Sequence, residues 1–210
     1  MINIEECYST GTVQGASNVG GLIGFLYNAR VVNSYSTSNL DETLGWRTTL
    51  WGREYMFRYF GGFAGSSGGL EVINCYSAGK VAGVPYGNYT QVEYKGFLGA
   101  DTYAYNDVSS SYFDIDKAGR TDSFATAKST QEMKQQITFN GWNFINIWGI
   151  ESGFNDGYPF LLFSYTPTEG LNIFVITDTG LKQIAEIFVI TDTGLMMVSG
   201  GNIISDVGLK

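Results

Sequence analysis

Short alternations of apolar and polar residues run through the chain and are interrupted repeatedly by glycine. The strings "GGLIG" at 20–24, "GGFAG" at 61–65 and "KGFLG" at 95–99 set Leu, Ile, Phe or Ala beside glycine. Alternation with a period of two is typical of β-strands, whose successive side chains point to opposite faces. We therefore expect many short strands with Val, Leu, Ile and Phe facing inward, and glycine where neighbouring layers pack closely.

A second string, centred on tyrosine, alternates with the glycine string. It reads "ECYSTG" at 6–11, "NSYSTS" at 33–38 and "NCYSAG" at 74–79, with a fainter copy, "SSYFD", at 110–114. The step from glycine to the next tyrosine is nearly constant: 14 residues from Gly21 to Tyr35, 14 from Gly62 to Tyr76 and 16 from Gly96 to Tyr112. The return step varies: 13 residues from Tyr8 to Gly21, 27 from Tyr35 to Gly62 and 20 from Tyr76 to Gly96. Constant segments that alternate with variable ones predict stacked layers, with loops that leave the stack.

These strings resemble the repeats of the GLUG-motif family, which occur in large bacterial surface proteins, adhesin-like chains and some secreted peptidases. The resemblance extends over residues 5–165, because "SSYFDIDKAG", "STQEMKQQITFNGWNF", "IWGI" and "DGYPFL" are similar to the closing segment that commonly follows such repeats. It implies an all-β chain folded as a right-handed parallel β-solenoid that serves in extracellular adhesion or display. It implies no catalytic residues, since a peptidase that carries such repeats has its active site in another domain.

The chain is expected to have three parts: solenoid repeats at 1–113, a closing segment at 114–165 and hairpin repeats at 166–210. A short capping helix is predicted near 129–136, because Ser129 and Glu132 have the spacing of a capping box. We expect the aromatic residues that follow to plug the open end of the solenoid: Trp142, Phe144, Trp148, Phe154, Tyr158 and Phe160.

The tail contains Asp-Thr-Gly twice, a string that aspartic proteases show at each catalytic carboxylate. "IFVITDTGL" at 173–181 recurs at 187–195, and "GNIISDVGL" at 201–209 is a decayed third copy, so the period is 14 residues. A 14-residue unit is too small to form the sides of the cleft in which a catalytic carboxylate dyad lies. We interpret Asp178, Asp192 and Asp206 as turn residues of short hairpins, and the Thr pairs beside them as too few for an ice-binding face. A Ca²⁺ site on this aspartate column is the competing interpretation.

Charge and composition exclude several classes of function. The formal net charge is −8, so binding to nucleic-acid phosphates is not expected. The chain has no histidine, which excludes Ser-His-Asp and Cys-His catalysis, imidazole-held zinc and the HExxH metalloprotease. We expect no cofactor and no metal. No apolar run reaches the length of about 18 residues that a membrane span needs, and the start lacks the pattern of a signal peptide.

The two cysteines occupy equivalent positions in their repeats. Cys7 and Cys75 are two repeats apart, with Ser34 at the same position between them. Two layers separate Cα atoms by about 9.6 Å, beyond the limit of about 7 Å for a disulfide. We therefore predict two free, buried thiols.

The longest variable segment, residues 41–60, is the candidate contact surface. It holds three of the five arginines of this acidic chain together with Trp and Tyr, residue types that dominate binding hot spots and stack on sugars. The candidate residues for a ligand or partner are Trp46, Arg47, Trp51, Arg53, Tyr55 and Arg58. The alternative is a β-hairpin flap whose aromatic residues cover the flank of the solenoid.

The sequence predicts a non-catalytic, structural or adhesive module at a cell surface or on a virion. Its partners would be a neighbouring chain or further copies, bound through the solenoid ends and the C-terminal hairpins, or a glycan or host receptor. A phage tail-fibre or virion-surface protein is the first alternative. The second is a glycan-active enzyme on the same scaffold, for which Asp114 and Asp116 are the candidate acids.

Overall fold

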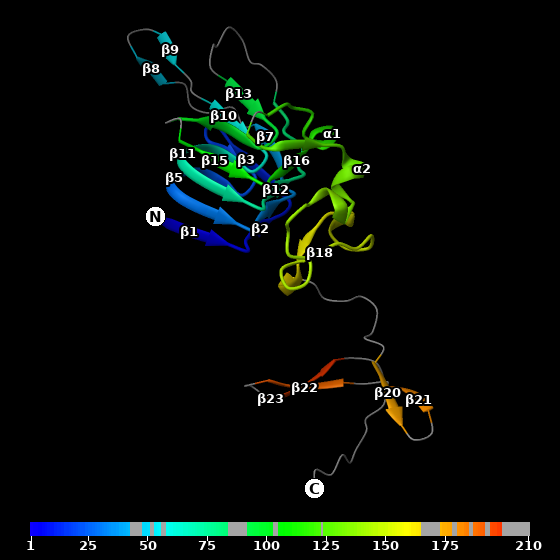
Figure 1. Ribbon diagram of the computed structural model, residues 1–210. Coiled ribbons are helices and arrows are strands. Elements are labelled where there is room, and N and C mark those ends of the chain that lie inside the picture. The colour runs from blue at the N-terminus through cyan, green and yellow to red at the C-terminus, as the bar shows by residue number, and fades with distance from the viewer. Residues whose placement is uncertain are drawn as a thin grey trace. The chain divides into compact units, whose positions relative to one another are not determined.

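The computed structural model describes residues 1–42, 48–50, 53–55, 58–83, 92–102, 105–122 and 124–164, and four strands between residues 173 and 198 (Figure 1). Only the backbone is described for residues 42, 48–50 and 53–55 and for the four C-terminal strands. Contacts divide the chain into two units, Met1–Ser164 and Tyr165–Lys210. The described part of the first unit is mostly β-strand with a few short helices, which confirms the all-β prediction.

Four sheets with parallel strands build the first unit. The largest contains β1 (Ile2–Glu5), β5 (Ile23–Val32), β11 (Ala64–Ile73), β14 (Leu98–Asp101) and β15 (Asp107–Ser109). The second contains β2 (Tyr8–Ser9), β6 (Tyr35–Ser36), β12 (Tyr76–Ser77), β16 (Tyr112–Asp114) and β17 (Thr126–Lys128). The third contains β4 (Val19–Gly20), β10 (Arg58–Gly61) and β13 (Val92–Lys95), and the fourth β3 (Thr12–Gly15) and β7 (Asn39–Glu42). Figure 1 shows β1, β5 and β11 side by side, so segments from successive repeats are neighbours in space.

The repeats lie over one another in register. Tyr8 pairs with Tyr35, Tyr35 with Tyr76 and Tyr76 with Tyr112, so the tyrosine strings form one column across four strands. The largest sheet contains a second column of paired residues, whose side chains pack in the interior core. It is formed by Ile4, Val31, Val72 and Val108. The stacking that the Gly and Tyr spacings predict is confirmed.

Local backbone chemistry explains why the repeats can stack. The residue two places before each tyrosine has a positive φ of 46° to 53°, and these residues are Glu6, Asn33, Asn74 and Ser110. Asn adopts this conformation more readily than most residues, and Asn74 Nδ2 also donates to Asn33 Oδ1 in the next layer at 3.3 Å. At Gly62 a Cβ would collide with the carbonyl oxygen of Gly96. Glycine therefore allows the close approach of layers that the sequence predicts.

The closing segment begins with an element that the sequence analysis missed. Helix α1 (Ile115–Ala118) has Asp114 as its N-cap and Gly119, at φ 61°, as its C-cap. The predicted capping box is confirmed: Ser129 and Glu132 satisfy each other's backbone amides at the start of α2 (Thr130–Met133). The remaining elements are η1 (Gln136–Thr138), β18 (Trp148–Gly149), η2 (Asn155–Gly157), β19 (Phe160–Leu161) and η3 (Leu162–Ser164).

The aromatic residues of the closing segment cover a flank rather than the end that the sequence predicted. Trp148 packs against Tyr35 and Tyr76, with ring centroids 6.1 and 6.2 Å apart. Phe139 meets Tyr112 edge-on at 5.3 Å, and Phe163 lies 6.4 Å from Tyr8. The segment therefore follows the tyrosine column across four layers, and its aromatic residues form a second apolar cluster with that column, apart from the interior core.

The second unit contains antiparallel hairpins. Strand β20 (Ile173–Thr177) pairs with β21 (Gly180–Ile184), and β22 (Ile187–Thr191) pairs with β23 (Gly194–Val198). The predicted hairpins are confirmed for the first two copies, which form two separate two-stranded sheets. Asp178, Asp192 and Asp206 lie outside the described residues, so the turn and Ca²⁺ interpretations stay predictions.

The cysteine prediction is half correct. Both thiols are free, and Ser34 lies between their layers as expected, because Cys7 N donates to Ser34 Oγ and Tyr76 N to Ser34 O. Cys75 is buried, but Cys7 is exposed. The expectation that both are buried was wrong because Cys75 has a layer on each side, whereas Cys7 is in the first layer of the described sheet.

Candidate functional site

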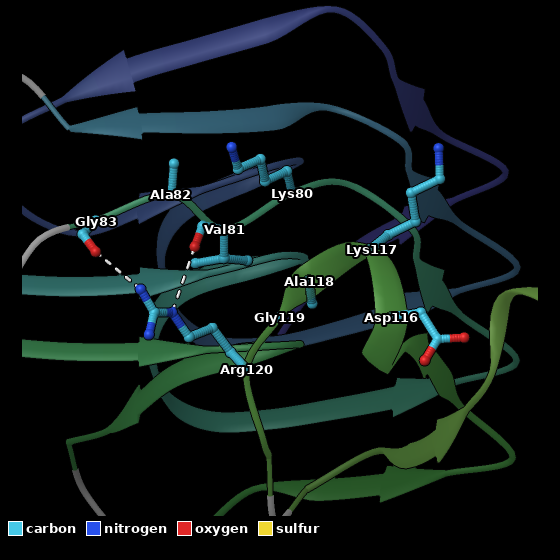
Figure 2. A pocket seen from close by; sticks show the side chains of 9 residues that line it. All are labelled: Lys80, Val81, Ala82, Gly83, Asp116, Lys117, Ala118, Gly119 and Arg120. Carbon is cyan, nitrogen blue, oxygen red and sulfur yellow. Dashed lines mark hydrogen bonds between the residues drawn. The ribbon is translucent and has the colours of Figure 1, made fainter.

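A surface pocket of about 500 Å³ lies between two segments that are far apart in the sequence (Figure 2). One wall is the strand-like segment after β12, and the other is α1 with the two residues that follow it. Its lining residues are Lys80, Val81, Ala82, Gly83, Asp116, Lys117, Ala118, Gly119 and Arg120. A volume in this range is typical of sites for small molecules.

The repeat architecture positions the first wall. Leu40 of β7 forms a parallel bridge with Val81, and Leu40 N donates to Lys80 O at 2.7 Å. Val81 N in turn donates to Ala118 O at 3.4 Å, which joins the two walls. Val81 and Ala118 are both buried and belong to the interior core. Both walls of the pocket are therefore anchored in the interior core and fixed by the stack.

Arg120 spans the pocket and is held at several points. Its Nε donates to Val81 O at 3.4 Å and a terminal nitrogen donates to Gly83 O at 2.8 Å, as Figure 2 shows. Its guanidinium also lies 5.3 Å above the ring centroid of Tyr94. Because Arg has five donors, the remaining ones are available to a ligand in a fixed orientation.

The pocket is basic on an acidic chain. Three of the 12 Lys and Arg residues line it, against one carboxylate. Lys80 and Lys117 extend to the same side in Figure 2, and Asp116 points away from both. Asp116 Oδ2 accepts from Thr130 N at 2.9 Å, so this carboxylate faces α2. Lys117 has only a long, exposed ion pair, with its Nζ 4.0 Å from Asp156 Oδ2. The arrangement therefore favours an anion.

Arg58, the candidate contact residue whose side chain the structure describes, does not line this pocket. Trp46, Arg47 and Trp51 lie outside the described residues. Arg53 and Tyr55 belong to β9 (Arg53–Tyr55), which pairs antiparallel with β8 (Thr48–Leu50), and their side chains are not described. The backbone thus confirms a hairpin in this segment. Arg58 is in β10 with only 4% of its surface exposed.

The two candidate acids of the enzyme alternative have structural contacts. Asp114 is fully buried, and its carboxylate accepts from Lys117 N at 2.9 Å, Thr130 Oγ1 at 2.7 Å and the Tyr158 hydroxyl at 2.6 Å. Burial, and then this contact with Asp114, raises the pKa of Tyr158 above its usual range. Asp114 therefore joins α1 and α2 to Tyr158, which follows η2.

No local signal in the sequence marks the pocket. Lys80 and Arg120 are 40 residues apart and belong to different repeats. The repeat itself is the signal that could have indicated these residues. "AGKVAG" begins at the end of one tyrosine string, and "DIDKAGR" begins at the end of the next.

Comparison with known proteins agrees with this architecture. Residues 15–40, which include β4 to β6 and Tyr35 of the tyrosine column, match the family model described as the GLUG motif. The chain carries a GLUG motif. This confirms the family resemblance that the Gly and Tyr strings indicate.

A curated relative matches this chain over a longer stretch. A protein of Evansella cellulosilytica named "Putative Gly-rich membrane protein" is 36% identical over 104 residues. The match covers 47% of this chain and only 11% of the relative, so the matched stretch corresponds to a small part of that protein. No solved structure shows a significant match to it.

Two further observations concern membrane-spanning helices and metal ligands. Within the described ranges, no helix is both long and apolar enough to cross a bilayer. Over the same ranges, no three His, Cys, Asp or Glu side chains gather as metal ligands.

Proposed function

We propose that this chain is a non-catalytic, surface-associated structural module that attaches its bearer to a cell or host surface. Its first unit winds as a right-handed parallel β-solenoid, and the variable segments between the layers carry recognition. The module acts outside the cell.

One observation carries the proposal: Tyr8, Tyr35, Tyr76 and Tyr112 occupy the same position on four adjacent parallel strands. A chain that advances by one strand in each sheet per repeat is a solenoid, with layers about 4.8 Å apart. Crossover connections between parallel strands are almost always right-handed, which supports the proposed hand. Such stacks provide length and a rigid base for loops.

The location is supported by the comparisons. The GLUG motif at 15–40 belongs to repeats that we expect in surface proteins, and the name of the Evansella cellulosilytica relative describes a membrane protein. The non-catalytic character is supported by Asp114, whose carboxylate is buried and already accepts three hydrogen bonds.

The variable segment at 41–60 remains our proposed contact for a partner chain, a further copy or a glycan. Replacing Trp51 and Arg53 by Ala should abolish association without lowering the free energy of unfolding. Retained binding with a large loss of stability would instead favour the hairpin as a cover for the flank.

The localisation is tested on the intact gene product in its own cells. Antibody against residues 1–164 should label unbroken cells, and external protease should remove the label. Labelling only after lysis would contradict the proposal, and recovery only in purified virions would favour the tail-fibre alternative. Release of new reducing ends from a glycan panel by the purified chain would contradict the non-catalytic assignment.

A further inference from the structure

We propose that the pocket between residues 80–83 and 116–120 binds the carboxylate of an acidic sugar, such as a hexuronic acid unit of a polysaccharide. This inference deepens the proposed function, because it names a ligand class for an attachment module. The residues that define it differ from the candidate contact residues of the variable segment at 41–60.

The charge of the pocket selects an anion. Lys80, Lys117 and Arg120 line it, and the single acid, Asp116, is engaged by Thr130 N and points away from the lysines (Figure 2). Lys80 has no ion-pair partner in the part of the chain that the structure describes. The chain as a whole is strongly acidic, with a formal net charge of −8. A local basic site on such a surface is therefore where an anion gains most from direct contact.

The shape of the pocket suits a ring with one charged group. Arg120 is anchored through Val81 O and Gly83 O, so its orientation is set before the ligand arrives. Lys80 and Lys117 are exposed, and their long stems and rotatable ammonium donors can reach hydroxyl groups on either side of a carboxylate. A volume of about 500 Å³ admits more than a bare ion, so a sugar ring that carries the carboxylate fits the pocket.

The test titrates trigalacturonate, the probe, into the full chain. Calorimetry measures the affinity, and amide chemical shifts locate the binding site. We expect saturable binding, with the largest shifts at Gly83, Ala118 and Gly119. Raising the salt from 0.1 M to 1 M should weaken binding, because the Debye length falls from about 10 Å to about 3 Å. Shifts confined to other residues would overturn the assignment of the site.

The decisive variant is Lys80→Ala combined with Lys117→Ala, which should lower affinity by about tenfold or more. Both side chains are exposed, so the melting temperature should stay within a few degrees of wild type, and Arg120 is left in place to keep the wall intact. The matched control is Lys95→Ala, a lysine on β13 that is paired with Glu93 at 3.1 Å and lies outside the pocket. Unchanged affinity in the double variant would refute the proposal.

Two further ligands identify the chemistry. Neutral maltotriose should not compete with trigalacturonate, and equal binding of both would overturn the role of the carboxylate. Inorganic phosphate should compete only weakly, and phosphate binding without uronate binding would overturn the sugar assignment. Loss of surface labelling on intact cells would contradict the proposed function and leave this measurement in solution unaffected.

Discussion

The rings of Tyr35 and Tyr76 stack with centroids 5.0 Å apart and planes 3° from parallel, although the residues are 41 positions apart. Tyr8 extends the same stack, 5.1 Å from Tyr35. Each ring is the tyrosine of one repeat, so this contact measures directly how closely two layers pack. The closing segment packs against the outer side of this stack. The tyrosine column is therefore where the repeats contact the closing segment.

Truncation of Tyr76 should therefore destabilise the first unit strongly. Tyr76 is fully buried, its hydroxyl donates to Pro159 O at 2.5 Å, and Asn155 Nδ2 donates to that hydroxyl at 2.8 Å. We expect Tyr76→Ala to lower the free energy of unfolding by about 3–5 kcal/mol, as for other large buried aromatics. Denaturant unfolding followed by tryptophan fluorescence measures the loss.

Two companion variants separate the parts of this effect. Tyr76→Phe keeps the ring and removes the hydroxyl, so it should cost only about 1 kcal/mol. Tyr105→Ala is the same substitution as Tyr76→Ala at a residue 81% exposed, and it should change stability by no more than about 0.5 kcal/mol. Equal losses for Tyr76→Ala and Tyr105→Ala would contradict the role of the column.

Gly62→Ala tests the close approach of layers. A Cβ at Gly62 would meet the carbonyl oxygen of Gly96 and approach Ser77 Oγ to 3.1 Å. Because backbone of the next layer must move, we expect a loss of about 1–3 kcal/mol or more in the free energy of unfolding. Gly153→Ala is the control, since a Cβ there has no atom within 4 Å. Stability of Gly62→Ala at or above that of Gly153→Ala would show that the layers are not this close.

Local and periodic features of this fold can be predicted from the sequence, and non-local ones cannot. The tyrosine column follows from spacing because layers of equal length return the chain to the same position. The capping box at Ser129 and Glu132 follows because its two hydrogen bonds join residues three apart. Helix α1 escaped notice because four residues carry no apolar period, and the repeat context suggested that "FDID" was strand.

The pocket and the flank packing depend on which distant segments meet. Trp148 and Tyr35 are 113 positions apart, and nothing in either segment specifies the other. Apolar character alone predicts that the aromatics of the closing segment are buried, and not whether they cover an end or a flank. The same holds for Arg120, whose hydrogen bonds to Val81 and Gly83 arise only when the layers stack.

Asp114→Asn should weaken the closing segment. Oδ2 of the buried carboxylate accepts from both the Thr130 and Tyr158 hydroxyls, and Oδ1 accepts from Lys117 N, so the amide nitrogen of Asn would face either both hydroxyls or the Lys117 N–H. We expect a loss of about 2 kcal/mol in the free energy of unfolding. Asp107→Asn, at an exposed aspartate of β15, should have little effect. An Asp114→Asn chain as stable as wild type would contradict the structural role of this carboxylate. Asp114 would then again be a candidate catalytic acid.

The two thiols should differ in reactivity by orders of magnitude. Cys7 is exposed, whereas burial raises the pKa of Cys75 to about 12, so Cys75 has almost no thiolate near neutral pH. A thiol reagent at pH 8 should modify one equivalent rapidly in the native chain and two after denaturation. In Cys7→Ser the rapid phase should vanish, and in Cys75→Ser it should remain. Two rapid equivalents in the native wild type would mean that the layers covering Cys75 open readily, which a tightly stacked column does not allow.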